Sequence, residues 1–299
     1  MVKILDGVAE QKKIHQALLK SVHTLKNSFQ ISPALSIILI GNSPPSLLYV
    51  EKKKQFAEPL GIQIKLFHLD NSVSMEECLK LIETLNQDNN VHGILLQLPV
   101  PQTLDTGKLI QAIDPAKDVD GLHPLNAGKL MQGEEGLYPC TPQGCMHLIH
   151  LWKPNISGLI AVVVGRSNLV GKPLAALMTH ENATVIQTHS KTKNLKEITR
   201  LGDILVVAVG KTHLITKEFV KDGACIIDVG ISKDEQERTV GDVDFEDVKN
   251  MVSAISPVPG GVGPMTISYL MINLLKSCCL QNKISCGEIC FSYFKRVIR

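Results

Sequence analysis

The sequence predicts an α/β fold with two domains, each built on a parallel sheet that helices cover. Apolar runs with the length of buried strands alternate with segments of helical periodicity along most of the 299 residues. The composition agrees, because 44% of the residues are hydrophobic and 20% are charged, as in ordinary globular chains long enough for two cores. The best domain boundary lies near Tyr138-Pro139, between two series of strands and helices.

The first domain, predicted over residues 1–138, contains an opening helix and then three strands separated by two helices. Apolar residues at helical spacing predict the opening helix over Gln11 to Leu25. Ser74 and Glu77 stand in the order of a capping box, which predicts a helix running from there to about Asn86. The expected strands cover 34–41, 62–69 and 91–98.

The second domain, predicted over residues 139–264, has the strand–helix alternation of a Rossmann-type unit with a parallel sheet. Thr141 is expected to cap an apolar helix that enters this domain. The last helix, from Thr266 to about Cys279, is predicted to return to the first domain, which residues 265–299 complete. The strands of the second domain are expected at 159–165, 184–189, 204–210 and 225–230.

Charge and composition exclude several classes of partner. The formal net charge is +2 and aromatic residues make up 4% of the chain, which disfavours binding to nucleic acid or to a membrane surface. The first residues lack the apolar core of a secretory signal, and no apolar run approaches the roughly 20 residues of a membrane span. We therefore expect a soluble, cytoplasmic protein whose eight cysteines are reduced, and their spacing predicts no metal site.

Three polar residues close to predicted strand ends and turns indicate a proton-transfer site. Lys53 lies four residues after Tyr49 on a predicted helix whose first turn Ser46 is expected to cap, so both side chains share one face. Gln97 ends an apolar strand, where α/β proteins place site residues, and Asp120 lies in a polar loop. Taken singly, each residue has an ordinary interpretation: a solvated helix face, a backbone-bonded amide and a turn carboxylate.

A glycine turn after the strand at 159–165 is a candidate phosphate site. The sequence Gly165-Arg166-Ser167-x-x-x-Gly171 differs from Gly-x-Gly-x-x-Gly, but it also joins a strand to a helix N-terminus, where exposed amides favour a phosphate. An ordinary tight turn is an equal alternative. The next strand ends in His189-Ser190-Lys191 instead of the acid typical of NAD sites, and with Arg166 this favours the 2′-phosphate of NADP.

The segment from Pro257 to Pro264 contains three glycines and three prolines in eight residues, which predicts a rigid loop. Prolines limit the freedom of such a loop, and glycines allow the backbone to approach a ligand closely. A rigid loop in front of a helix N-terminus, expected here at Met265-Thr266, can bind a flat ligand or an anion. A linker is the alternative interpretation, although linkers rarely need such stiffness.

Together these stretches resemble the bifunctional methylenetetrahydrofolate dehydrogenase/cyclohydrolase family, the FolD-type enzymes of one-carbon metabolism. Each motif alone is weak, but their joint order and spacing are specific, and the resemblance extends to about Leu275. Ser256 stands where the family commonly has threonine, and the tail after Cys278 has no match in the family pattern. The matching stretches are 49–53, 93–101, 114–121, 139–142, 165–173, 228–230, 241–244 and 257–266.

The resemblance implies two reactions in one site, and therefore an oxidoreductase that is also a hydrolase. A hydride passes from 5,10-methylenetetrahydrofolate to NADP, and water then opens the methenyl product to 10-formyltetrahydrofolate, a one-carbon donor in purine biosynthesis. Lys53 is implied as the central catalytic residue, with Gln97 as its hydrogen-bonding partner. Burial lowers the pKa of such catalytic lysines, so that the amine can accept a proton near neutral pH.

The resemblance also assigns the remaining site residues. Tyr49 and Asp120 complete the catalytic set, because Tyr49 stacks on or orients the folate and Asp120 accepts hydrogen bonds from the pterin. A homodimer is implied by the family alone. Two alternatives are a dehydrogenase that lacks the cyclohydrolase and a non-catalytic dinucleotide-binding module. The folate pocket is walled by Val258, Pro259, Gly260, Gly261 and Thr266, and NADP is met by Gly165, Arg166, Ser167, Ser190 and Ile231.

Overall fold

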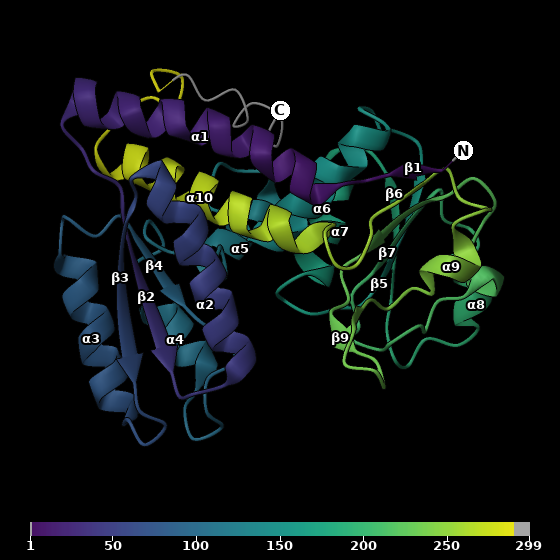
Figure 1. Cartoon of the computed structure of the whole chain (residues 1–299), viewed down its shortest axis with the longest axis horizontal. Coiled ribbons are helices and arrows are strands. Elements are labelled where there is room, and N and C mark those ends of the chain that lie inside the picture. Colours follow the sequence, from purple (N-terminus) through teal and green to yellow (C-terminus); the bar gives the residue numbers. More distant parts are fainter. Residues whose placement is uncertain (1, 290–299) are drawn as a thin grey trace. The chain divides into compact units, whose positions relative to one another are not determined.

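The computed structural model describes residues 2–289 and divides the chain into two compact units (Figure 1). Unit 1 comprises the described residues up to Lys12 together with Pro139–Tyr269, and unit 2 comprises Lys13–Tyr138 and the described residues from Leu270 onward. The chain passes from one unit to the other within α1 (Gly7–Phe29), at Tyr138/Pro139 and within α10 (Val262–Gln281). Each unit contains a parallel sheet, so the predicted α/β class is confirmed.

The described part of unit 2 holds a three-stranded parallel sheet, sheet B, in the order β3-β2-β4. Its strands are β2 (Ala34–Ile40), β3 (Gln63–Leu69) and β4 (Gly93–Leu96), which confirms the three predicted strands. Figure 1 shows α2 (Pro44–Ala57) and α3 (Met75–Gln87) along these strands. Every residue of β4 is buried and β2 is buried beyond its first residue, as the continuous apolar runs predict.

The two predicted helix starts in unit 2 have different outcomes. The capping box of α3 is confirmed, because Ser74 Oγ accepts from the Glu77 amide at 3.1 Å and the Glu77 carboxylate accepts from the Ser74 amide at 2.9 Å. The predicted cap at Ser46 is wrong: α2 begins at Pro44, its N-cap is Ser43, and Ser46 is buried inside the helix. Proline fixes a φ suited to the first helical positions, so the helix starts earlier.

Unit 2 also contains the part of α1 from Lys13 onward. The predicted apolar stripe of α1 is confirmed, since Ile14, Leu18, Val22 and Leu25 are all at most 1% exposed. Three short helices were not predicted: η1 (Glu58–Leu60), α4 (Thr106–Ala112) and α5 (Pro124–Gln132).

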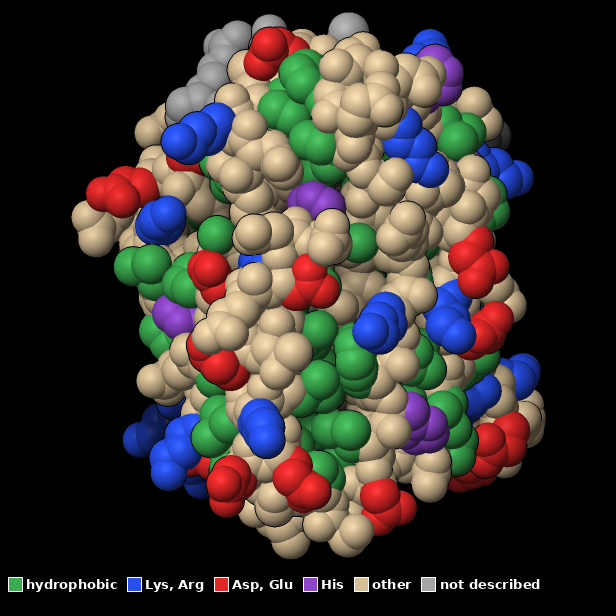
Figure 2. All heavy atoms as spheres, turned by 90° about the vertical axis from the view of Figure 1, so that its left-hand side faces the viewer, with side chains coloured by type: hydrophobic (Ala, Val, Ile, Leu, Met, Phe, Trp, Pro, Cys, Tyr) green, Lys and Arg blue, Asp and Glu red, His purple; other side chains and the backbone are tan. Residues whose placement is uncertain are grey.

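Figure 2 shows acidic and basic side chains interspersed on one face of the molecule, with hydrophobic side chains exposed among them.

Unit 1 is built on a parallel sheet of six strands among the described residues, sheet A, in the order β1-β11-β8-β7-β5-β6. The four predicted strands of this unit are confirmed. The two-residue strands β1 and β11 were not predicted, because such short segments carry no period, and their pairing groups residues 3–4 with unit 1. The strands are β1 (Lys3–Ile4), β5 (Ile160–Val164), β6 (Thr184–Thr188), β7 (Ile204–Val207), β8 (Cys225–Asp228) and β11 (Ala254–Ile255).

The core of unit 1 gathers side chains from the central strands, among them Val162, Leu205 and Ile226, each 0% exposed. A small antiparallel hairpin pairs β9 with β10. The bounds of the hairpin and of the smaller helices are β9 (Ser232–Lys233), β10 (Thr239–Val240), α6 (Cys140–Trp152), α7 (Gly171–His180), α8 (Leu195–Thr199), η2 (Lys217–Phe219) and α9 (Phe245–Val248).

Two expected helix starts in unit 1 are wrong. Thr141 does not cap α6, which begins at Cys140; its hydroxyl instead shares a hydrogen bond of 3.0 Å with Thr266 Oγ1. α10 begins at Val262, four residues before Thr266, so the end of the glycine-rich segment is helical. Pro264 is tolerated there because the amides of a first turn have no intrahelical acceptor.

No helix among residues 2–289 combines the length and the apolar character that a membrane crossing requires. Within the same residues, no cluster of three or more His, Cys, Asp or Glu side chains is placed to hold a metal ion. Each of the seven described cysteines is a free thiol. Cys290 and the remaining tail lie outside the described residues.

Candidate active site

The candidate proton-transfer residues of unit 2 lie at a topological switch point of sheet B. Because β2 pairs with β3 on one side and with β4 on the other, the carboxyl ends of β2 and β4 flank the position where open α/β sheets bind ligands. Lys53 lies on α2, which follows β2, and Gln97 follows β4 directly. The Gln97 amide donates to Ile38 O at 2.9 Å, which fixes the backbone of Gln97 beside β2.

Lys53 and Gln97 are joined by a buried hydrogen bond. Lys53 Nζ donates to Gln97 Oε1 at 2.7 Å, and Gln97 Nε2 donates to Leu98 O at 2.8 Å. The second bond turns the amide oxygen toward the lysine. Lys53 is 9% exposed and Gln97 is 8% exposed, so an amine that would ordinarily be solvated is held in a largely dry site by an uncharged acceptor.

Asp120 follows a segment that continues sheet B beside β4. Ile94 and Asp118 form a parallel bridge, and the Ile94 amide donates to Lys117 O at 2.8 Å. Asp120 therefore lies two residues beyond a bridged position, in register with the end of β4. Asn273 Nδ2 donates to Val119 O at 2.8 Å and fixes the segment from the other side. The carboxylate-bearing residue is half-buried.

The two charged residues before Asp120 are structural, and sequence reasoning did not assign them this role. Lys117 Nζ donates to Leu85 O, Asn86 O and Asp88 O at the end of α3. Asp118 Oδ2 accepts from the His123 amide at 2.8 Å and from Asn126 Nδ2 at 2.9 Å, and burial raises the pKa of Asp118. Polar residues in a loop indicate solvent exposure on pattern alone, so only the fold identifies these two as anchors.

Tyr49 lies one helical turn before Lys53 on α2, as predicted. Its side chain is half-buried, and burial raises the pKa of the Tyr49 phenol. The phenol is therefore neutral at physiological pH and presents a ring and a hydroxyl group. This combination suits contact with a flat, partly polar ligand.

Unit 1 has a switch point of its own, between the carboxyl ends of β5 and β7, because β5 pairs with β6 on one side and with β7 on the other. Gly165 has a φ of +135°, and a Cβ atom there would lie 2.5 Å from Ala208 O. A Cβ atom on Gly171 would lie 2.2 Å from Gly165 O. The close approach of this turn to the segment at Ala208 thus requires glycine at position 165, and the tight packing within the turn requires glycine at position 171.

Three polar side chains accompany this glycine turn. Ser167 Oγ accepts from the Val170 amide at 3.1 Å and orders the turn before α7. Arg166 is exposed beside it, and Ser190, two residues after β6, is exposed as well. No acidic residue follows β6 before Asn194, so these exposed groups offer hydrogen-bond donors and a positive charge to an anion.

Ile231 and the glycine-rich segment share the same edge of sheet A. Because the strands of sheet A are parallel, the segments after β8 and β11 leave it at the edge where the glycine turn lies. Ile231, after β8, is 51% exposed. Gly260, whose φ is +105°, accepts at its carbonyl oxygen from the Val8 amide at 3.2 Å. A Cβ atom on Gly7 would lie 1.8 Å from Gly261 O, so the loop is packed against the start of α1.

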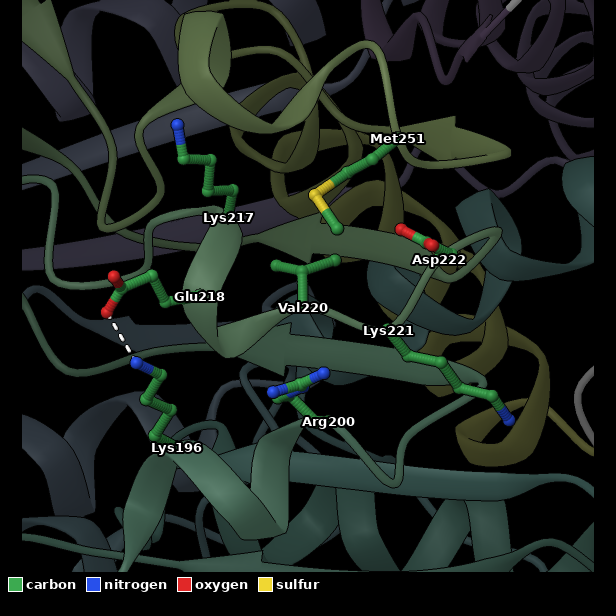
Figure 3. Close-up of a pocket in the computed structure, with 8 residues that line it drawn as sticks. All are labelled: Lys196, Arg200, Lys217, Glu218, Val220, Lys221, Asp222 and Met251. Carbon is green, nitrogen blue, oxygen red and sulfur yellow. Dashed lines mark hydrogen bonds and ion pairs between the residues drawn. The ribbon is translucent and has the colours of Figure 1, made fainter.

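A hollow of about 290 Å³ in unit 1 lies at the opposite edge of sheet A (Figure 3). Its lining residues precede β7, β8 and β11, whereas ligands of open α/β sheets bind at the carboxyl ends of strands. Its three lysines are each within ion-pair distance of an acid: Lys196 of Glu218, Lys217 of Asp247 and Lys221 of Asp203. We therefore do not place the site there. The lining residues are Lys196, Arg200, Lys217, Glu218, Val220, Lys221, Asp222 and Met251.

Comparisons with known proteins agree across both units. The family model of the tetrahydrofolate dehydrogenase/cyclohydrolase catalytic domain matches residues 5–120, and that of the corresponding NAD(P)-binding domain matches residues 139–282. Bifunctional protein FolD of Streptococcus equi is 49% identical over 271 residues, which are 91% of this chain and 95% of that protein. A FolD protein of Streptococcus agalactiae is 47% identical over the same shares.

Two solved structures are similar over most of the chain. The bifunctional FolD enzyme of Campylobacter jejuni superposes with a TM-score of 0.92 at 43% identity, covering 95% of this chain and 100% of that one. The Trypanosoma brucei methylenetetrahydrofolate dehydrogenase-cyclohydrolase, solved in complex with NADP cofactor and inhibitor, has a TM-score of 0.88 at 35% identity. That match covers 92% of this chain and 97% of that one.

Proposed function

Since this chain belongs to the tetrahydrofolate dehydrogenase/cyclohydrolase family, we propose that it catalyses the two reactions of that family in one shared active site. The enzyme oxidises 5,10-methylenetetrahydrofolate to the 5,10-methenyl compound with NADP and hydrolyses this product to 10-formyltetrahydrofolate. The observation that carries our assignment of residues is the buried hydrogen bond from Lys53 Nζ to Gln97 Oε1.

Lys53 is the general base of the hydrolysis. Water attacks the cationic methenyl carbon, and the neutral Lys53 amine takes one proton from this water, which leaves a neutral carbinol. The ammonium then returns this proton to the ring nitrogen as its bond to the carbon breaks. The carbinol hydroxyl loses its own proton to solvent as the formyl C=O forms, so one proton is released overall. Gln97 orients the amine through its oxygen and adds no negative charge that would favour the ammonium form. Positioned acid–base catalysis of this kind is worth about 10²–10⁴ in rate.

NADP is held by unit 1, because the residues there fit a dinucleotide. Gly165 and Gly171 let the backbone of this turn pack closely, and Gly165 and Ser167 lie beside the start of α7, where amides favour a phosphate. Arg166 and Ser190 suit the 2′-phosphate, and exposed Ile231 offers an apolar surface for a flat ring. When bound, the nicotinamide supplies the acceptor for the hydride.

We assign folate binding to the remaining predicted residues. Asp120 accepts hydrogen bonds from the amino and ring N–H groups of the pterin, and Tyr49 orients the ring system. We assign folate binding to residues 1–138, completed by 265–299, and NADP binding to residues 139–264. The folate is walled by Val258, Pro259, Gly260, Gly261 and Thr266.

Two assays on the purified protein test this function. Reduction of NADP that depends on methylenetetrahydrofolate, compared side by side with NAD, is expected to favour NADP and would exclude a non-catalytic dinucleotide-binding module. Loss of the methenyltetrahydrofolate absorbance faster than in buffer is expected as well. A protein that reduced NADP but did not accelerate this second reaction would be a dehydrogenase without cyclohydrolase.

We also propose that the enzyme is a cytoplasmic homodimer that binds neither nucleic acid nor membrane. The family resemblance supports the dimer, and the net charge of +2, with charges interspersed on the face shown in Figure 2, supports the absence of an electrostatic partner surface. Light scattering should give twice the chain mass of 32.7 kDa. Cell fractionation should recover the activity without detergent.

A further inference from the structure

We propose that two buried aspartates, Asp242 and Asp228, are positioning residues for NADP: their carboxylates fix the backbone loops that form the carboxyl edge of sheet A beside the switch point. Neither residue touches the reacting atoms in this proposal. It deepens the NADP-binding part of the proposed function and rests on it.

Asp242 holds three consecutive backbone amides of the loop that follows β7. Its side chain is 0% exposed. Oδ2 accepts from Val209 N at 2.7 Å and from Gly210 N at 3.0 Å, and Oδ1 accepts from Lys211 N at 2.7 Å. The loop therefore wraps around the buried carboxylate, while Gly210 and Lys211 are exposed to solvent.

This loop is one wall of the switch point. It begins at Ala208, whose carbonyl oxygen would be 2.5 Å from a Cβ atom on Gly165, so the loop touches the glycine turn assigned to the phosphates. Gly210 has a φ of +65°, a conformation that glycine adopts without strain. A shift of this loop would change the shape of the edge where a dinucleotide binds.

Asp228 in turn fixes the backbone of Asp242. Asp228 ends β8 and is 4% exposed. Its Oδ1 accepts from Asp242 N and Gly230 N, both at 3.0 Å, and its Oδ2 accepts from Val243 N at 2.9 Å. The bond to Gly230 also fixes the turn that leads to Ile231. The two carboxylates therefore hold both the loop after β7 and the turn after β8.

Two glycines next to the aspartates leave no room for a side chain. A Cβ atom on Gly241 would lie 1.9 Å from Asp228 Oδ2, and a Cβ atom on Gly230 would lie 2.3 Å from Asp242 Cγ. Two neighbouring buried carboxylates destabilise a fold relative to uncharged groups of similar size. The two aspartates hold six backbone amides at the carboxyl edge of sheet A. This is the edge that we assign to the cofactor.

The test uses a variant of nearly identical shape, Asp242→Asn. The amide replaces one acceptor oxygen by an N–H donor that faces the amides of the loop, so the loop must move. We expect the KM for NADP to rise about 10- to 100-fold, as one or two lost hydrogen bonds predict. Hydrolysis of methenyltetrahydrofolate uses no NADP and should stay within about twofold of wild type, which reports an intact fold.

Asp244→Asn is the matched control, because Asp244 also accepts a backbone amide, that of Asp247 at 3.2 Å, but does so at the start of α9. Its KM for NADP should equal that of wild type. In an Asp242→Asn protein that folds, an unchanged KM, or equal losses of both activities, would overturn the proposal. A wild-type protein that did not reduce NADP at all would instead overturn the proposed function.

Gly210→Ala decides the matter if Asp242→Asn does not fold. A Cβ atom at Gly210 meets nothing within 4 Å, so alanine strains only the backbone conformation that the Asp242 carboxylate fixes. A severalfold rise in the KM for NADP with normal cyclohydrolase activity supports the proposal, and a KM equal to that of wild type contradicts it.

Discussion

The two switch points are built from different parts of the chain. In unit 2 the working groups are side chains, an amine and an amide joined at 2.7 Å between Lys53 and Gln97. In unit 1 they are backbone atoms, brought close by Gly165 and Gly171 and, in our proposal, held by Asp242. The difference follows the chemistry, since proton transfer needs a titratable side chain and a dinucleotide needs amides and space.

This contrast makes the two activities separable. Hydrolysis needs the side chains of unit 2 and no cofactor, whereas hydride transfer also needs the backbone edge of unit 1. A substitution at one switch point should therefore move one measured quantity and leave the other unchanged.

Removing the amine is expected to have the largest effect. Lys53→Met keeps an unbranched side chain but no base, so hydrolysis of methenyltetrahydrofolate should fall by about 10³-fold, while NADP affinity measured by fluorescence stays within about twofold. Lys52→Met, at the exposed neighbouring position, is the control and should hydrolyse normally. Hydrolysis at the normal rate in Lys53→Met would refute the base assignment.

Adding a Cβ atom to the glycine turn of unit 1 should affect the other activity. In Gly171→Ala the new Cβ atom would lie 2.2 Å from Gly165 O and 2.9 Å from Arg166 N, so the turn must shift. We expect the KM for NADP to rise about 10- to 100-fold, with hydrolysis nearly unchanged. Gly128→Ala, where a Cβ atom meets nothing within 4 Å, should behave as wild type. A normal KM in Gly171→Ala would contradict the assignment of NADP to this turn.

Changing the amide partner tests how Lys53 is oriented. Gln97→Leu removes the acceptor at similar volume, and hydrolysis should fall about tenfold. Gln97→Glu keeps an acceptor but adds a negative charge, which favours the ammonium form of Lys53, so hydrolysis should require a higher pH than in wild type. A pH–rate profile identical to that of wild type would show that Gln97 does not act on the amine.

The buried carboxylates of unit 1 predict a pH-dependent stability. Burial raises the pKa of Asp228 to about 7 from its ordinary value of 3.8. Between these values the folded chain holds a proton that the unfolded chain has lost, so the contribution of this group to the free energy of unfolding falls as pH rises. The expected slope is about −1.4 kcal/mol per pH unit.

Denaturant unfolding of wild type and Asp228→Asn between pH 5 and pH 7 measures this slope as a difference, since asparagine does not titrate. The difference in the free energy of unfolding, wild type minus variant, should decrease with rising pH. A difference that stayed constant over this range would mean that Asp228 is an ordinary ionised carboxylate in the folded state, because the group would then be ionised in both states.

Local patterns sufficed for much of the fold but not for the helix starts at Ser46 and Thr141. The long apolar strands, the stripe of α1 and the capping box at Ser74 depend on neighbours along the chain, and they were predicted correctly. The starts of α2 and α6 were not, because the prolines Pro44 and Pro139 decide them and the hydroxyl groups of Ser46 and Thr141 do not cap these helices.

Local sequence patterns predicted even less about the roles of the site residues. Lys53 and Gln97 were paired through the family resemblance, since no local period joins residues 44 apart. Lys117 and Asp242 were missed as anchors, because each binds backbone groups about 30 residues away and a charged residue in a loop ordinarily indicates solvent. Contacts between distant segments, and not propensity, determine these roles.

The most direct test of the contrast measures cyclohydrolase rate and NADP affinity in parallel on Lys53→Met and Asp242→Asn. We predict a crossed result: the first variant binds NADP normally and does not hydrolyse the methenyl compound, and the second hydrolyses it normally and binds NADP weakly. Loss of both properties in both variants would contradict the assignment of side-chain chemistry to unit 2 and of backbone-built cofactor binding to unit 1.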